Sequence, residues 1–158
     1  MVQKELKDVF SQLAAGVTLI TIGSEESPHA MTATAFMPLS LDPPLILVAI
    51  EKKNETHQIF CSSKSSFGVS LLSADQQPIS DRYSRKDPDR FHFKGVDTFT
   101  GPSGSVLIAG SSAALEAELS EQHDAGDHTI FIGKIIWVQA DTKNSPLVYW
   151  QRGYHSLD

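Results

Sequence analysis

The stretch that decides the fold reads Met31-Thr-Ala-Thr-Ala-Phe36, followed by Ser40-Leu-Asp-Pro-Pro44 and the apolar run Leu45-Ile-Leu-Val-Ala-Ile50. A strand pattern passes into small residues and two threonines, and the double proline then forces an extended turn before a buried strand. Small side chains beside Thr32 and Thr34 let a ligand approach the backbone N–H groups, and the two hydroxyls add further donors. This pattern indicates a way to hold a phosphate group without a basic patch.

Composition limits the class of protein. A chain of 158 residues, 41% of them hydrophobic, predicts one domain over residues 1–158 with a sizeable core. The net charge of -6 argues against a nucleic-acid-binding protein, which usually carries a basic face. Cys61 is the only cysteine, which excludes an intramolecular disulfide. Neither a leader segment nor an apolar run of roughly 18 residues is visible, so we expect a soluble, cytoplasmic protein without membrane contact.

Hydrophobic periodicity predicts a mainly β chain with flanking helices. Apolar residues at helical spacing favour an amphipathic helix over residues 4–14, which Gly16 ends. Asn54 is a candidate N-cap for a helix over residues 55–61. A capping box from Ser73 to Gln76 predicts a helix over residues 74–83, which Pro78 shortens or kinks. Strands are expected over residues 17–22, 31–36, 45–50, 67–72, 129–138 and 147–150.

Two other segments are harder to interpret. Residues 84–104 are polar and rich in glycine, proline and aspartate, and we expect one long loop of the kind that forms lids or binds partners. Residues 112–122 have the composition of a helix, yet Leu115, Ala117 and Leu119 alternate as in a strand. From the residues alone, both interpretations of this segment remain open.

The blocks of the chain, in this order, resemble the flavin reductase-like family of FMN-binding split barrels. The resemblance covers nearly the whole chain and implies an FMN-binding split β-barrel, with a strand over residues 112–122. It also implies a homodimer in which each flavin pocket lies near the subunit interface. The segments that carry the resemblance are 15–18, 31–36, 40–45, 67–76, Ser80-Asp-Arg82, Gly126-Asp-His-Thr-Ile-Phe-Ile-Gly133, Pro146-Leu147 and Tyr154.

The activity that this resemblance implies is flavin reduction. NADH or NADPH would pass a hydride to FMN, or to FAD or riboflavin, and reduced flavin would reach an acceptor such as a separate monooxygenase component. The absence of a Ser-His-Asp triad does not argue against an enzyme, because a flavin itself takes and releases the electrons. The alternative is an FMN-binding electron carrier that resembles flavoredoxins and lacks an efficient nicotinamide site.

The expected flavin contacts come from three segments. The resemblance places the phosphate and ribityl chain at residues 32–35, with Lys52 and Lys53 as counter-charges, and the ring or adenylate end at residues 81–83. Related reductases often carry an arginine after the apolar strand and asparagine at the position of Thr34, so phosphate contacts are expected to be rearranged here. The alternatives are solvated lysines and threonines that merely favour strands. The expected contacts are Met31, Thr32, Ala33, Thr34, Ala35, Phe36, Ser40, Ala49, Ile50, Glu51, Lys52, Lys53, Thr56, Asp81, Arg82 and Tyr83.

The segment Gly126-Asp127-His128-Thr129 is the candidate for nicotinamide binding. Glycine lets the backbone come close, and the aspartate can orient the imidazole through its N–H. By resemblance, His128 is the catalytic residue on the open face of the flavin, and Tyr154 closes over the same site. The alternatives are a turn with a satisfied histidine, and an aromatic plug at Tyr154.

Several polar residues are expected to have no part in catalysis. The six histidines show no spacing such as H-x-x-x-H, so we expect no metal site. Arg82 has the alternative of pairing with Asp87 or Asp89 on the surface. Cys61 follows Ile59 and Phe60 and is expected to be a small buried hydrophobe. Surface charges are expected at Glu116, Glu118 and Glu121.

Overall fold

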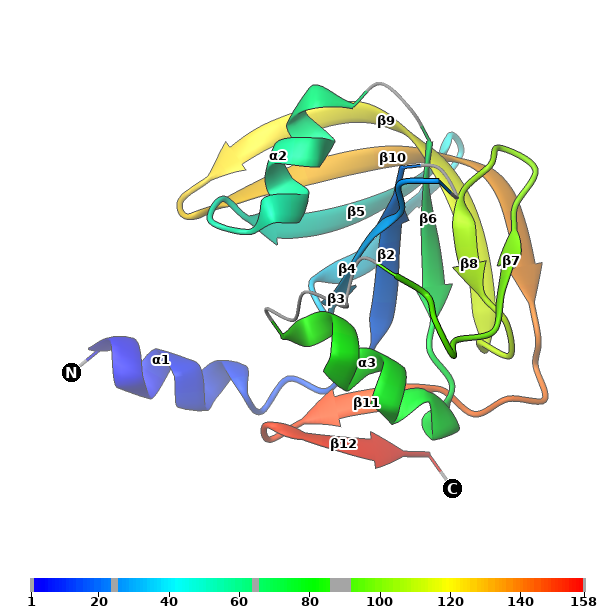
Figure 1. The fold of residues 1–158 in the computed structure, drawn as a ribbon. Helices are drawn as coiled ribbons and strands as arrows, with labels where there is room; N and C mark the ends of the chain where they lie inside the picture. Colours follow the sequence, from blue (N-terminus) through cyan, green and yellow to red (C-terminus); the bar gives the residue numbers. More distant parts are fainter. Residues whose placement is uncertain (1, 24–25, 64–65, 86–91, 158) are drawn as a thin grey trace.

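The computed structural model describes residues 2–23, 26–63, 66–85 and 92–157, and a seven-stranded antiparallel sheet dominates it (Figure 1). The sheet curls around a core but does not close, because β3 and β4 remain its two edges. The predicted fold class, mainly β with flanking helices in a split barrel, is confirmed. In the order β3-β2-β6-β9-β10-β5-β4, the strands are His29–Ala33, Thr18–Ile22, Ser66–Leu71, Ala113–Ala125, His128–Ala140, Pro44–Glu51 and Phe36–Leu41.

The described residues also form two smaller sheets and three α-helices. The first small sheet has the order β1-β11-β12, and the second pairs β7 with β8. Helix α2 covers one end of the barrel, whereas α1 extends away from it (Figure 1). The bounds are Ala15–Gly16 for β1, Leu147–Trp150 for β11, Gly153–Ser156 for β12, Thr98–Thr100 for β7, Val106–Ile108 for β8, Val2–Phe10 for α1, Glu55–Ser62 for α2 and Gln77–Ser84 for α3.

The main core lies inside the curled sheet under α2. Alternate residues of β5, Ile46, Val48 and Ile50, point inward and are buried. Phe60 of α2 packs between Phe67 and Phe131, with ring centroids 5.1 and 5.2 Å away. Burying aromatic rings of this size supplies much of the hydrophobic stabilisation of a small barrel.

The predicted helix caps are present, but the second predicted helix is divided into two parts. The side chain of Asn54 accepts a hydrogen bond from the backbone N–H of Thr56 at 3.0 Å and so caps α2. The side chain of Gln76 accepts one from the N–H of Ser73 at 3.0 Å. The helix expected over residues 74–83 is divided into a 3₁₀ turn, Ala74–Gln76, and α3. Pro78 has no N–H to donate, so it stands in the first turn of α3.

Several other expectations need correction. Residues 84–104 are not one loop, because β7 lies within them; residues 86–91 are outside the described part of the chain. Strands β4, β8 and β12 were not expected either. Residues 113–122 lie within β9, so the strand that the resemblance implied for residues 112–122 is confirmed apart from its first residue. Cys61 is exposed rather than buried.

Glu116 is the largest correction, because it is fully buried rather than solvated. Its carboxylate accepts hydrogen bonds from the backbone N–H groups of Ser103 at 2.9 Å and Ser105 at 3.0 Å. A Cβ on Gly101 would stand 2.4 Å from the carboxyl carbon of Glu116, so only glycine leaves room for this carboxylate. Glu116 therefore fastens the turn between β7 and β8 to the barrel.

This anchor gives a stability prediction. Glu116→Ala leaves two backbone donors without their acceptor, and we expect it to lower the free energy of unfolding by about 2–3 kcal/mol. Glu118→Ala is the matched control, because Glu118 lies on the same strand but is exposed; its effect should stay within about 0.5 kcal/mol. Urea denaturation measures both variants, and equal stability of the two would contradict the anchoring role.

Candidate functional site

Strand pairing brings three of the predicted segments side by side. His128 stands opposite Glu51, and Ile130 stands opposite Ala49. On the other side of β5, the N–H of Ala49 donates to the carbonyl of Ala35 at 2.9 Å. Two strand spacings, or about 10 Å, therefore separate β10 from the turn after β3. Because Ala35 and Ala49 carry only methyl groups, the sheet here offers a shallow floor on which a planar group can approach the backbone.

His128 and Asp127 form a hydrogen-bonded pair at the rim of this floor. Nδ1 of His128 lies 2.7 Å from Oδ1 of Asp127, and the imidazole is 41% exposed. The hydrogen bond from His128, and then its charge, lower the pKa of Asp127, with a smaller contribution from Lys53. Since an ionised carboxylate only accepts, Nδ1 of His128 is the donor in this hydrogen bond, which fixes the orientation of the ring. Gly126, with a φ of 65°, makes the preceding turn.

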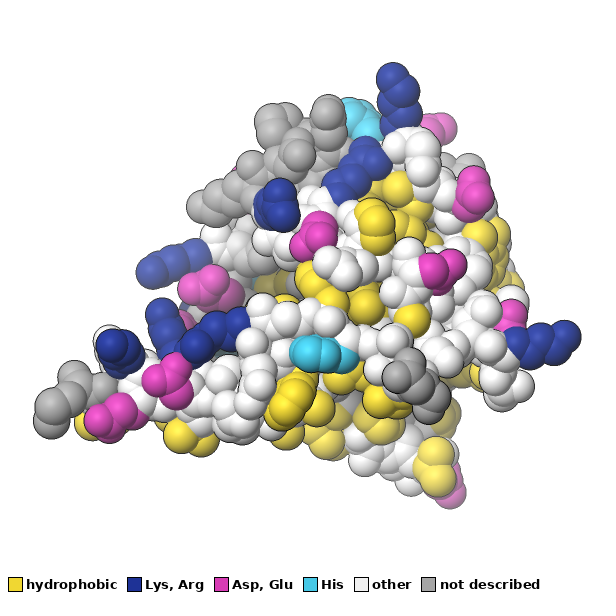
Figure 2. All heavy atoms as spheres, turned by 90° about the horizontal axis from the view of Figure 1, so that it is seen from below, with side chains coloured by type: hydrophobic (Ala, Val, Ile, Leu, Met, Phe, Trp, Pro, Cys, Tyr) yellow, Lys and Arg dark blue, Asp and Glu magenta, His cyan; other side chains and the backbone are white. Residues whose placement is uncertain are grey.

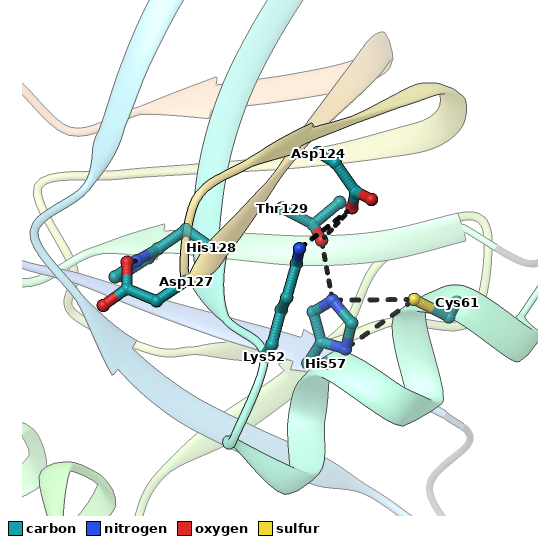
Figure 3. Close-up of polar contacts among 7 residues, drawn as sticks. All are labelled: Lys52, His57, Cys61, Asp124, Asp127, His128 and Thr129. Carbon is teal, nitrogen blue, oxygen red and sulfur yellow. Dashed lines mark hydrogen bonds and ion pairs between the residues drawn. The ribbon is translucent and has the colours of Figure 1, made fainter.

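Thr129 and Lys52 point away from this pair, toward α2 (Figure 3). Nε2 of His57 lies 2.8 Å from Oγ1 of Thr129, and that hydroxyl donates to Asp124 at 3.3 Å. Nζ of Lys52 forms an ion pair with Asp124 at 3.4 Å. Cys61 stands beside the same cluster, with its Sγ 3.8 Å from the ring nitrogens of His57. Thr129 and Lys52, which were both predicted as ligand contacts, thus lie on the opposite side of β10 from His128.

Two more predicted contacts are packed inside the protein. Thr56 is fully buried, and its Oγ1 lies 2.8 Å from Nε2 of His29. Tyr83 is buried against Phe93, and its hydroxyl donates to the carbonyl of His92 at 3.1 Å. Burial raises the pKa of Tyr83, and the positive charge of Arg82 partly offsets this rise. Neither hydroxyl is therefore directed toward a surface ligand.

Arg82, on α3, holds the segment that contains His92 and Lys94 against that helix. Its guanidinium donates to the carbonyls of His92 at 2.6 Å and Lys94 at 2.8 Å, and it lies over the ring of Tyr83. The alternative partners Asp87 and Asp89 lie outside the described residues. This arrangement gives Arg82 a structural role at the predicted position.

The remaining predicted flavin contacts lie on β3, β4, β5 and α3, and in the turn after β5. Met31, Ala33 and Ile50 are buried, and their side chains belong to the main core. Phe36 packs against the core, Ser40 is half-buried, Asp81 pairs with Arg85 at 3.9 Å, and Lys53 is exposed.

A cavity of about 220 Å³ brings Tyr154 together with Thr32 and Thr34. Oγ1 of Thr32 donates to the carbonyl of Ser80 at 2.8 Å, and the hydroxyl of Ser80 lies 2.8 Å from that of Tyr154. Thr34 is exposed and lines the cavity wall. Sequence reasoning missed Ser80 as a site residue. Ser80 lies two residues after Pro78, in the first turns of α3.

The described ranges of the chain bear on metal binding and on membrane insertion. No three His, Cys, Asp or Glu side chains among these residues lie close enough together to hold a metal ion. None of the helices in the same ranges is long and apolar enough to cross a membrane.

Comparison with known proteins identifies the family. The family model described as "Flavin reductase like domain" matches residues 10–158. An NADH-dependent FAD reductase of Streptomyces globisporus is 38% identical, over 84% of this chain and 73% of that protein. The reductase component of 4-hydroxyphenylacetate 3-monooxygenase of Thermus thermophilus is 31% identical, over 98% of this chain and 97% of that protein.

A solved structure agrees with these sequence matches. BorF, the flavin reductase component of a bacterial two-component tryptophan halogenase, superposes with a TM-score of 0.89 at 38% identity and 98% coverage of both chains. The family match spans nearly the whole chain and includes every strand of the seven-stranded sheet. The chain therefore belongs to the flavin reductase-like domain family.

Proposed function

We propose that this protein is a flavin reductase that transfers a hydride from NADH or NADPH to FMN, or to FAD or riboflavin. Reduced flavin would then pass to an acceptor such as a monooxygenase component, as the names of the relatives suggest. The observation that carries this proposal is His128, whose ring is held by Asp127 at the rim of the floor of Ala35 and Ala49. An electron carrier would not need an oriented imidazole at this position.

The chain's own residues have to bind and orient the reactants. A bound flavin supplies the redox chemistry, so the protein contributes position and charge. With Nδ1–H donated to Asp127, His128 offers Nε2 as an acceptor for the carboxamide N–H of a nicotinamide. Lys53 lies close enough to influence Asp127, and its charge would favour the negative charge that develops on reduction. The methyl side chains of Ala35 and Ala49 leave room for a flat ring system.

The phosphate contacts we propose differ from those expected from sequence. The hydroxyl of Thr32 already donates to Ser80, and Lys52 already pairs with Asp124. Thr34, which is exposed at the cavity wall, is the threonine best placed to donate to the ribityl phosphate. This assignment agrees with the departure of the chain from the asparagine and arginine that relatives often carry.

We also infer that two copies pair through the outer face of β4, β5 and β10. Met37, Leu47 and Ile132 stand opposite one another across these strands, outside the main core. Met37 is 48% exposed, and Leu47 and Ile132 are half-buried. An apolar outer sheet face of this kind is typical of an interface, and a two-fold axis would bury it on both copies.

The first test is an anaerobic spectrum of the purified protein with FMN, followed by NADH and NADPH in separate cuvettes. We expect one nucleotide to bleach the flavin absorbance rapidly, because hydride transfer reduces the ring. Bleaching by dithionite alone, with neither nucleotide active, would favour the electron carrier and contradict the reductase.

The second test concerns His128. We expect His128→Ala to lower kcat/KM for the nucleotide about tenfold, or about 1.4 kcal/mol, with an unchanged Kd for FMN. The matched control is His123→Ala, because His123 bonds Glu121 at 2.9 Å as His128 bonds Asp127. Stopped-flow kinetics and flavin fluorescence measure both constants. Weakened FMN binding with normal nucleotide kinetics would remove His128 from this role.

The third test concerns the pairing of two copies. Analytical ultracentrifugation should give a dimer for the native protein and a monomer for Ile132→Lys, because the lysine would place a charge in the apolar interface. Leu157→Lys, at an exposed leucine near the C-terminus, should remain dimeric. A native monomer, or an unchanged dimer in Ile132→Lys, would refute the proposed face.

A further inference from the structure

The turn that carries Asp127 and His128 stands at the end of the long hairpin formed by β9 and β10 (Figure 1). Within the described residues, β6 pairs with β9 only as far as Glu118, so the last part of β9 has β10 as its one strand neighbour. His128 is the first residue of β10 that pairs with β5. The sheet therefore supports this turn from the side of β5, and side-chain contacts have to support it from the other side.

Helix α2 and the turn before it supply such contacts on the inner face of the hairpin (Figure 3). Thr129 and Asp124 stand opposite each other at the base of the turn. Nε2 of His57 lies 2.8 Å from the buried hydroxyl of Thr129. The N–H of Lys52 donates to the carbonyl of Asp127 at 2.9 Å, while Nζ of Lys52 pairs with Asp124. Both ends of the turn are thus tied to the barrel.

The hydroxyl of Thr129 is the central group of this arrangement. Its single proton is donated to Asp124 at 3.3 Å, so its oxygen accepts a hydrogen bond from Nε2 of His57. The half-buried imidazole of His57 also packs against Phe131 in a T-shaped arrangement, with ring centroids 5.7 Å apart. Packing and a hydrogen bond to the same strand thus hold the ring of His57 in one orientation.

The ion pair between Lys52 and Asp124 contributes less than this hydroxyl. Its two side chains are 38% and 81% exposed, and water screens such pairs. Figure 2 shows basic and acidic side chains lying together around α1, and the pair of Arg152 with Asp8 of that helix is likewise exposed. Exposed pairs are therefore ordinary on this surface, whereas a buried hydroxyl that bonds two partners is not.

A cavity of about 480 Å³ lies between α2 and the end of the hairpin. His57 lines it from the helix, and Gln122 and Thr129 line it from the hairpin. Because the two elements are not closely packed here, packing alone does not resist a shift of the hairpin. The hydrogen bond between His57 and Thr129 spans the gap and takes over this task.

We propose that His57 and Thr129 are positioning residues for hydride transfer, because their hydrogen bond fixes the turn on which the Asp127–His128 pair stands. Thr129 and His128 are neighbours on β10 with side chains on opposite faces, so Thr129 acts from behind the ring. A small displacement of His128 slows transfer, because the reacting rings need a close and defined approach. The inference rests on the proposed function for the role of His128.

A double-mutant cycle tests this proposal. Thr129→Val removes the hydroxyl and keeps the shape, and we expect it to lower kcat/KM for the nucleotide about fivefold with an unchanged Kd for FMN. Thr129→Ser keeps the hydroxyl and should retain most of the rate. In the His128→Ala background, Thr129→Val should have no further effect, because the group that it positions is gone. Equal losses in both backgrounds, or normal kinetics of Thr129→Val, would overturn the proposal.

Two other variants complete the cycle. His57→Leu removes the donor of the same bond, so it should match Thr129→Val and add nothing when the two are combined. Thr21→Val is the matched control, because Thr21 is equally buried and its hydroxyl donates to the carbonyl of Val106. It should lose stability but keep native kinetics, and an equal loss of kcat/KM in this control would overturn the proposal.

Magnetic resonance spectra of protein with isotope-labelled histidine test the turn without catalysis. The signal of His128, identified by its loss in His128→Ala, should shift or broaden in Thr129→Val and stay unchanged in Thr21→Val. An unchanged signal in Thr129→Val would overturn the proposal. Native protein that reduces no flavin, with the signal altered as expected in Thr129→Val, would refute the proposed function instead.

Discussion

The pairing of β10 with both β5 and β9 is the constraint on which the rest of the structure depends. Its register with β5 runs from His128 opposite Glu51 to Lys134 opposite Leu45. Because side chains alternate along a strand, this register turns Thr129 inward and His128 outward. A shift of one residue would exchange the two faces and would move His128 from the rim into the core. The core, the apolar outer face and the candidate site thus share one register.

The sequence predicted those parts of the fold that depend on neighbouring residues. The inner strands, the cap at Asn54 and the interrupted helix at Pro78 all follow from local patterns, and the structure confirms them. Glu116 was misjudged because its partners lie in the turn around residues 103–105, which no local pattern links to β9. Strand β7 was missed for the same reason, since its pairing with β8 is all that defines it.

The contacts of the candidate site also divide into local ones, which the sequence predicted, and long-range ones, which it did not. The Asp127–His128 bond joins adjacent residues and was predicted, whereas the bond from Thr32 to Ser80 joins residues 48 positions apart and was not. The inward direction of the Thr129 side chain could be inferred from the sequence, because a residue next to an outward histidine on a strand must point inward. The resemblance brought both residues into one site, and strand geometry separates them.

The contact between Gly101 and Glu116 has a consequence for how this protein can change over evolutionary time. Any side chain at position 101 would collide with the carboxylate, and any shorter residue at position 116 would leave two backbone donors unpaired. A single substitution at either position is therefore costly, and a compensating pair needs both a side chain that fits at 101 and an acceptor at 116 that still reaches the N–H groups of Ser103 and Ser105. Among descendants of this chain, the two positions should vary together or not at all.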